Sequence, residues 1–120
     1  MTQFENYDLE KRTLLFSKNL IVFLNRCPKG TITIPLIDQV LRAGTSIGAN
    51  YREANGASSK KDFQNKIYIC KKEANETLYW LKLLGNSLDD EKLKEECWKL
   101  WQETKEFVLI FGKIAASSKN

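Results

Sequence analysis

The chain contains only two prolines, Pro28 and Pro35, and both lie in one short stretch. Proline inside a helix removes a backbone hydrogen bond and clashes with the preceding turn, so a helix rarely continues through it. The segment before residue 28 and the much longer one after residue 35 are therefore free of the strongest helix breaker. This distribution predicts a fold made of a few long helices.

Local signals divide these segments into four helices, at about residues 8–26, 34–55, 59–86 and 90–115. Asp8, Thr33 and either Ser58 or Ser59 are residue types that accept hydrogen bonds from the free N–H groups of a first helical turn, and Asp89 or Asp90 suits the start of the fourth helix. The Asn-Gly pair at 55–56 and the Gly-Asn-Ser run at 85–87 are typical of helix ends. Short connections favour antiparallel neighbours. We therefore expect one all-α domain over residues 1–120, an antiparallel up-down-up-down four-helix bundle.

Each predicted helix has an apolar seam with the three- and four-residue spacing of one helix face. In the first helix, Leu14, Ser17, Ile21 and Leu24 form the seam that we expect to face the core. The later seams comprise Ile37, Val40, Leu41, Gly44, Ile47, Gly48 and Tyr51; Phe63, Ile67, Cys70, Ala74, Thr77, Leu78, Leu81 and Leu84; and Leu93, Cys97, Leu100, Thr104, Phe107, Phe111 and Ile114. Gly44 and Gly48, four residues apart, indicate close packing between helices.

The helices carry more apolar surface than these seams require. Additional aromatic residues outside the seams include Tyr79, Trp80, Trp98 and Trp101. One interpretation is that wide apolar stripes simply bury more of a small domain. The other is self-association, because aromatic residues outside a core are enriched at interfaces. We favour a homo-oligomer, with these four residues as interface candidates.

The sequence contains no histidine. It therefore lacks an imidazole base, a Ser-His-Asp arrangement and a histidine metal ligand. Glu73 and Glu76 lie one turn apart, as carboxylates do in di-iron bundles, but those sites combine glutamate with histidine at the third residue. Ion pairing with a neighbouring helix is the better interpretation, and Arg42 is the natural partner. We expect no catalytic residue, no metal, no cofactor and no enzymatic activity.

The three cysteines, Cys27, Cys70 and Cys97, are odd in number and widely spaced. This pattern favours free thiols in a reducing compartment. The first residues do not resemble a signal peptide, and no segment approaches the ~18 apolar residues of a membrane span. We therefore expect a cytoplasmic protein with no membrane partner.

A polar strip lies beside the apolar seam of the second helix. Ser46, Asn50 and Glu53 recur at spacings of four and three residues, and asparagine is a poor helix former. The strip is either a buried network between helices that fixes their register or a functional surface. With the residues of the predicted ion pairs, the polar motif comprises Arg42, Ser46, Asn50, Glu53, Glu73 and Glu76.

Basic residues gather at the turn between the second and third helices and continue down the third. They are Arg52, Lys60, Lys61, Lys66, Lys71 and Lys72. One interpretation is an ordinary solvated lysine face. The other is a nucleic-acid-binding patch, in which lysines contact phosphates and Tyr68 contacts a base. The net charge of +4 is mild, but an oligomer would repeat the patch and strengthen it by avidity.

The residues at 42–54, Arg-Ala-Gly-Thr-Ser-Ile-Gly-Ala-Asn-Tyr-Arg-Glu-Ala, resemble the signature of the four-helix-bundle proteins encoded within intervening sequences of bacterial 23S rRNA genes. The resemblance continues through residues 59–63 and 71–84. Ser46, Asn50, Glu53 and Glu76 match the polar positions of the signature. The family often has proline where this chain has Gly48, and glycine where it has Ala54.

The resemblance implies a homopentameric, barrel-like assembly of four-helix bundles. A similar protein is the accessory factor of diversity-generating retroelements, where it binds a reverse transcriptase and nucleic acid. For the rRNA-associated branch the resemblance implies no established activity.

Two functions follow as hypotheses. The first is a non-enzymatic oligomer that binds nucleic acid, RNA in preference to DNA, through a repeated basic patch. The alternative is a scaffold or accessory factor for a partner protein such as a reverse transcriptase.

Overall fold

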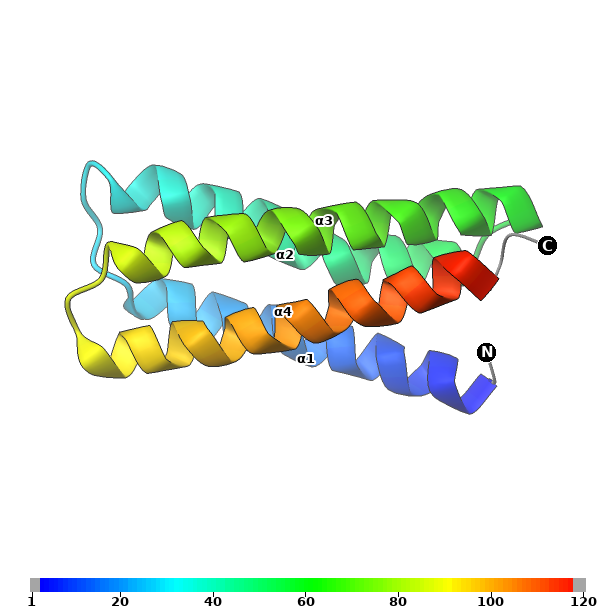
Figure 1. Cartoon of the computed structure of the whole chain (residues 1–120), viewed down its shortest axis with the longest axis horizontal. Helices are drawn as coiled ribbons and strands as arrows, with labels where there is room; N and C mark the ends of the chain where they lie inside the picture. The colour runs from blue at the N-terminus through cyan, green and yellow to red at the C-terminus, as the bar shows by residue number, and fades with distance from the viewer. Residues whose placement is uncertain (1–2, 118–120) are drawn as a thin grey trace.

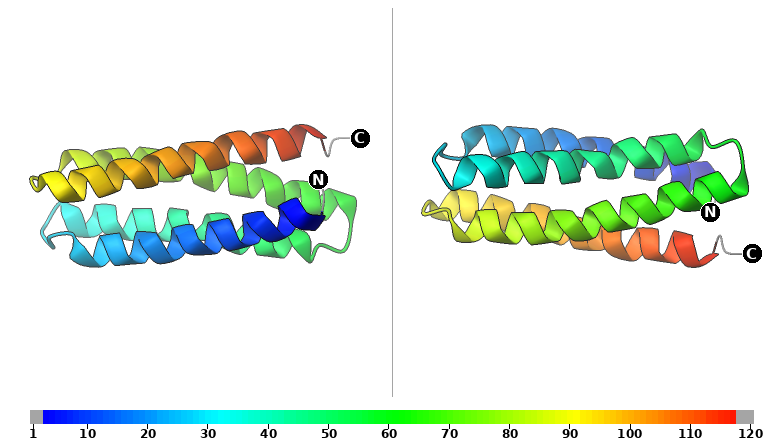
Figure 2. Two further views of the ribbon diagram at one scale, coloured as in Figure 1. Left: turned by 90° about the horizontal axis from the view of Figure 1, so that it is seen from below. Right: turned by 90° about the horizontal axis from the view of Figure 1, so that it is seen from above.

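The computed structural model describes the backbone of residues 3–117 and the side chains of residues 8–117. It contains four helices: α1 (Gln3–Arg26), α2 (Thr33–Asn55), α3 (Lys60–Asn86) and α4 (Glu91–Ser117). Consecutive helices run in opposite directions, and α4 returns beside α1 (Figure 1). Viewed from the side, α1 and α2 form one layer and α3 and α4 the other (Figure 2). The predicted all-α, up-down-up-down four-helix bundle is confirmed.

The ends of the helices follow the predicted signals at two of four starts. Ser59 Oγ accepts a hydrogen bond from Asp62 N at 3.0 Å, which caps α3. Asp90 Oδ2 accepts one from Leu93 N at 3.1 Å at the start of α4. Both side chains satisfy N–H groups that the first helical turn leaves free.

The capping roles predicted for Asp8 and Thr33 are wrong, although α2 begins within one residue of its predicted start. Helix α1 begins at Gln3, so Asp8 lies inside it, because the chain has no glycine or proline between residues 3 and 8 to interrupt the helix. Thr33 does not cap α2. Its hydroxyl donates to Pro28 O at 2.7 Å and accepts from Gly30 N at 2.8 Å, so it closes the preceding connection instead.

The core comes largely from the predicted seams of the last three helices. In α4, all seven predicted seam residues are buried. In α3, the fully buried residues are Ile67, Cys70, Ala74, Thr77, Leu81 and Leu84. In α2, Val40, Gly44, Ile47 and Tyr51 are buried as predicted, together with Ala43 and Ala54, whereas Leu41 remains 40% exposed. The spacing of apolar residues therefore predicted which face of these helices turns inward.

The predicted inner face of α1 is wrong. Leu14 and Ile21 are 55% and 43% exposed, and Ser17 is partly buried, so of that seam only Leu24 is fully inside. The residues of α1 that face the core are Leu9, Thr13, Phe16, Leu20, Phe23 and Leu24, and Cys27 directly after the helix is also buried. Helix α1 is thus rotated about its own axis relative to the prediction. The larger side chains of this second set explain the rotation, since Phe16 packs edge-on against Phe107 of α4 at 5.3 Å between ring centres.

Two glycines of α2 allow α1 to approach closely. A Cβ atom at Gly44 would lie 2.3 Å from Leu20 Cδ2, and one at Gly48 would lie 3.1 Å from Thr13 Cβ. A side chain at position 44 would therefore displace Leu20, whereas one at position 48 would require Thr13 to move by a few tenths of an ångström. This close contact confirms the predicted role of the glycines and turns Thr13 and Leu20 inward.

The rotation of α1 leaves apolar side chains on the outside of the α1–α2 layer. We define the apolar strip as Leu14 and Ile21 of α1 with Ile34 and Leu41 of α2, which are all 40% exposed or more. Leu14 also lines a groove of about 430 Å³ between the two helices, opposite Thr45 and Ala49. Leu15 and Val22 are exposed on the other side of α1.

Replacing Gly44 by valine is expected to lower the free energy of unfolding by about 1–3 kcal/mol, because the added carbons overlap the buried Leu20 side chain. Ala49→Val in the same helix is the control, since Ala49 is exposed and lines the open groove between α1 and α2, where a larger side chain has space. Urea unfolding measures both. An equal loss in the two variants would contradict close α1–α2 packing at Gly44.

Candidate functional site

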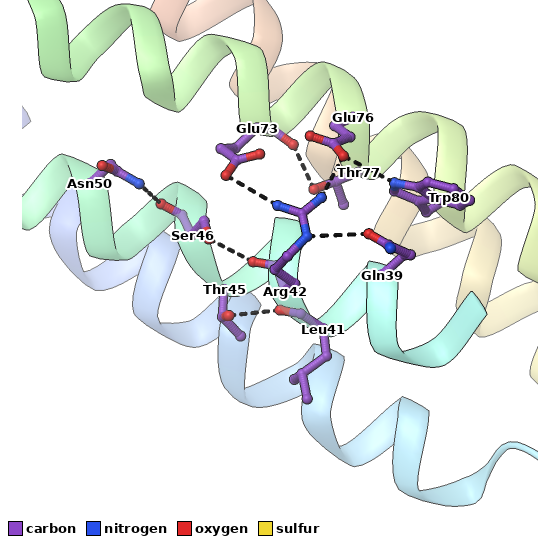
Figure 3. Close-up of polar contacts among 10 residues, drawn as sticks. All are labelled: Gln39, Leu41, Arg42, Thr45, Ser46, Asn50, Glu73, Glu76, Thr77 and Trp80. Carbon is purple, nitrogen blue, oxygen red and sulfur yellow. Dashed lines mark hydrogen bonds and ion pairs between the residues drawn. The ribbon is translucent and has the colours of Figure 1, made fainter. Parts of the chain in front are cut away.

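Arg42 of α2 reaches across to α3 between two glutamates. Its guanidinium donates to Glu73 Oε2 at 3.5 Å from Nη1 and to Glu76 Oε1 from Nη2 (Figure 3). Gln39 Oε1 accepts from Arg42 Nε at 3.2 Å, and Trp80 Nε1 donates to Glu76 Oε1 at 3.3 Å. The predicted partnership of Arg42 with the two glutamates is confirmed.

The two carboxylates differ in environment although they share one guanidinium. Burial and the adjacent carboxyl of Glu76 raise the pKa of Glu73, and its Oε1 atom is buried without a hydrogen-bond partner. Burial opposes ionisation of Glu76 as well, but the hydrogen bonds from Trp80 and Arg42 and the Arg42 charge outweigh it, so the pKa of Glu76 is lowered. Arg42 therefore holds two like charges together at the α2–α3 edge.

The remaining polar motif residues lie along the same edge of α2. Ser46 Oγ donates to Arg42 O at 2.6 Å, and Asn50 Nδ2 donates to Ser46 O at 2.8 Å, so both bond within their own helix (Figure 3). Glu53 instead crosses to α3, where Lys66 Nζ lies 2.9 Å from its Oε1. The contacts of Arg42 and Glu53 join α2 to α3 at the solvent edge of their interface.

The structure does not bring the six predicted basic residues into one patch. Arg52 lines the α1–α2 groove with Glu10 and Lys11. Lys66 is engaged by Glu53, whose hydrogen bond and charge raise the pKa of Lys66. The other four residues, Lys60, Lys61, Lys71 and Lys72, are exposed on α3. Arg52 and Lys66 therefore lie apart from this group.

Charge is divided between two flanks of α3. All three of its acidic residues belong to the flank next to α2: Glu73 and Glu76 contact Arg42, and Asp62 lies near Lys66. Lys60, Lys71 and Lys82 recur every eleven residues, close to three turns of about 3.6 residues, and so share one line. That line faces α4, since Lys71 Cε would lie 3.8 Å from a Cβ atom at Gly112.

Helix α4 shows the complementary division. Its Glu96 and Glu103 turn toward α1 and pair with Arg26 at 2.8 Å and Arg12 at 2.7 Å. Toward α3, Lys94 lines a hollow together with Lys82, and Lys105 Nζ lies 5.3 Å from the centre of the Trp101 ring. Acidic side chains thus pair at the α2–α3 and α1–α4 edges, while lysines flank the α3–α4 seam.

We define the basic face as the exposed lysines on the outer side of the α3–α4 layer. It comprises Lys60, Lys61, Lys71, Lys72, Lys82, Lys94 and Lys105. This layer faces the viewer in Figure 1. The last three lysines are absent from the predicted patch. The eleven-residue spacing of Lys60, Lys71 and Lys82, and of Lys94 and Lys105, is the sequence signal that identifies them.

The four predicted interface residues are exposed to different extents. Tyr79 and Trp98 are 60% and 53% exposed. Trp80 and Trp101 are partly buried and pack against the core. Trp98 and Trp101 stack on each other at 4.9 Å between ring centres, with an angle of 10° between their planes.

Burial explains the state of the three cysteine thiols. Cys27, Cys70 and Cys97 are buried and free. Burial raises the pKa of Cys27, and raises the pKa of Cys70 and of Cys97 to about 12. All three are therefore protonated at neutral pH, which disfavours them as nucleophiles.

Residues 3–117 contain neither a cluster of metal-ligand side chains nor a membrane-spanning helix. Within that part of the chain, no three histidine, cysteine, aspartate or glutamate side chains cluster as a metal site would require. None of its helices has the length and apolar character needed to cross a membrane.

Comparison with known proteins identifies relatives of most of the chain. The family model described as 23S rRNA-intervening sequence protein matches residues 5–105. A crystal structure of a protein of unknown function from the S23 ribosomal protein family of Bacteroides thetaiotaomicron is 35% identical, with a TM-score of 0.74. The match covers 88% of this chain and 96% of that one. No curated protein matches the chain.

Replacing Arg42 by methionine is expected to lower the free energy of unfolding by about 1–2 kcal/mol, since Glu73 and Glu76 are then left facing each other without their shared cation. In a Glu73→Gln background the same change is expected to cost less, because one of the two like charges is gone. Arg52→Met on the same helix is the control, and urea unfolding measures each variant. Equal losses of stability from Arg42→Met in both backgrounds would show that Arg42 does not offset the repulsion between Glu73 and Glu76.

Proposed function

The chain belongs to the 23S rRNA-intervening sequence protein family, and from this premise we propose that it is a non-enzymatic RNA-binding protein that acts as a homo-oligomer. The division of charge on α3 and α4 carries the proposal. A protein with a net charge of only +4 has no strong overall attraction for a polyanion. Seven of its lysines nevertheless gather on one face, while Glu53, Glu73, Glu76, Glu96 and Glu103 form ion pairs at other edges of the bundle.

The basic face has the composition expected of a nucleic-acid interface. Lysines contact phosphates without regard to sequence, and exposed aromatic rings provide surfaces on which bases stack. Tyr68 and Tyr79 are 41% and 60% exposed on α3. They alternate with Lys61 and Lys72 at spacings of seven, four and seven residues, which keeps all four on the outer side of the helix.

Self-association increases the strength of RNA binding beyond what a single basic face provides. Seven lysines on one subunit support only weak, salt-sensitive binding, whereas several linked faces act on one RNA with a high effective concentration. The apolar strip provides the surface for self-association, because large apolar side chains exposed on one layer of a protein are typical of interfaces. We propose a pentamer, the assembly that the resemblance to the family favours.

The two proposed surfaces do not compete for the same side of the molecule. The apolar strip belongs to the α1–α2 layer and the basic face to the α3–α4 layer, and these layers lie on opposite sides of the bundle (Figure 2). An oligomer formed through the first layer therefore leaves the second available to RNA in every subunit.

Reversing two charges of the basic face tests RNA binding. The double variant Lys71→Glu with Lys82→Glu is expected to weaken binding of structured RNA about tenfold or more, and to reduce the slope of log affinity against log salt by about 2. Fluorescence anisotropy across a salt series measures both quantities.

The matched control reverses two lysines of α4 outside the basic face. Lys99 lines the α1–α4 groove, and Lys92, seven residues earlier, shares its side of the helix. Lys92→Glu with Lys99→Glu changes the net charge equally and is expected to weaken binding much less. Equal losses in the two double variants would reject the basic face. Recovery of one partner protein after nuclease treatment, with no RNA affinity, would favour the scaffold function instead.

Placing charges in the apolar strip tests self-association. The double variant Leu14→Lys with Ile21→Lys is expected to shift the protein toward monomer, since neither side chain contributes to the core. Light scattering measures the mass, and Leu109→Lys, at a 57% exposed leucine of α4, is expected to leave it unchanged. An unaltered mass in the double variant, or a monomeric unmodified protein, would reject this interface.

A further inference from the structure

A hollow opens in the basic face near the α3–α4 turn. It has a volume of about 390 Å³ and is lined by Leu81, Lys82 and Gly85 of α3 and by Lys94, Trp98 and Trp101 of α4. This volume lies within the range of about 300–1,000 Å³ that is typical of small-molecule sites. The hollow is therefore large enough for one nucleotide-sized group.

The glycine on the α3 side keeps the two helices close at the hollow. A Cβ atom at Gly85 would lie 3.2 Å from Cys97 Sγ, and Cys97 is buried and donates to Leu81 O at 3.3 Å. No side chain from position 85 therefore fills the space beside the tryptophans. On this side the hollow is lined by Leu81, Lys82, Gly85 and Asn86.

The α4 side of the hollow presents a planar aromatic surface. Trp101 is partly buried and is contacted by Lys105, with Nζ 5.3 Å from the ring centre. Trp98 stacks on it in a nearly parallel arrangement, with ring centres 4.9 Å apart, and still exposes 53% of its surface. The indole of Trp98 is thus held in orientation by Trp101 while part of it stays open to a ligand.

Charge selects the kind of ligand. Lys82 and Lys94 bracket the hollow from the two helices, and none of its lining residues is acidic. An apolar peptide side chain or an acyl chain has no need of two flanking ammonium groups. A nucleotide matches both features, because its base is planar and its phosphates are anionic.

We propose that this hollow binds one unpaired nucleotide of RNA, with its base stacked on Trp98 and its neighbouring phosphates between Lys82 and Lys94. The inference rests on the proposed function, since the other lysines of the basic face hold the rest of the strand. It adds a preference: the protein binds unpaired RNA more tightly than duplex, whose bases are already stacked and cannot enter the hollow.

The test compares a short single-stranded oligouridylate with an RNA duplex of the same length. The variant Trp98→Leu is expected to weaken binding of the single strand about tenfold and to leave duplex binding unchanged, because stacking is lost and the lysines remain. Trp80→Phe, at the α2–α3 edge, is the matched control and is expected to change neither. Circular dichroism verifies that each variant is folded.

Tryptophan fluorescence gives a second readout from the same titrations. The single strand is expected to quench the Trp80→Phe protein, which retains Trp98 and Trp101, and to quench Trp98→Leu much less. If Trp98→Leu binds the single strand as tightly as the unmodified protein, or loses affinity for the duplex to the same extent, the inference is overturned but the proposed function is not. Equal quenching by uridine monophosphate at the same nucleotide concentration would assign the hollow to a free nucleotide and also overturn it. Absence of binding to either RNA would overturn the proposed function itself.

Discussion

The rotation of α3 about its own axis is the constraint on which the rest of the molecule depends. Burial of Ile67, Cys70, Ala74 and Leu81 sets this rotation, and Arg42 of α2 complements it from the solvent edge by contacting the acidic flank of α3. Once the acidic flank meets α2, helical geometry requires the lysines to lie along α4 and on the outer side. The surface charge of the protein is thus a consequence of its core.

The same division gives the two layers different characters. The close approach of α1 to the glycines of α2 turns Phe16 and Leu20 inward and leaves Leu14 and Ile21 outside. The α1–α2 layer is therefore partly apolar on its surface, whereas the α3–α4 layer is basic and aromatic. In the proposed function, separate surfaces for self-association and RNA would allow weak contacts in each subunit to combine through avidity.

Much of the fold could be predicted from the sequence because its signals are local. The spacing of apolar residues identified the inner faces of α2, α3 and α4, and Ser59 identified the start of α3. The inner face of α1 could not be chosen, since α1 is apolar on several sides and the choice depends on Gly44 and Gly48 of another helix. The pairing of Arg42 was predictable from hairpin geometry. The basic face was found only in part: Lys82, which continues the eleven-residue series of Lys60 and Lys71, was missed, and Lys94 and Lys105 join it through the packing of α4 on α3.

The central claim is that RNA contacts the α3–α4 layer and not the other edges of the bundle. Acylation of lysines in the presence and absence of single-stranded RNA, followed by mass spectrometry, measures this at each residue. The account predicts that RNA protects Lys71, Lys82 and Lys94 and leaves the reactivity of Lys92 and Lys99 unchanged. Uniform protection of all five, or protection confined to Lys92 and Lys99, would contradict it.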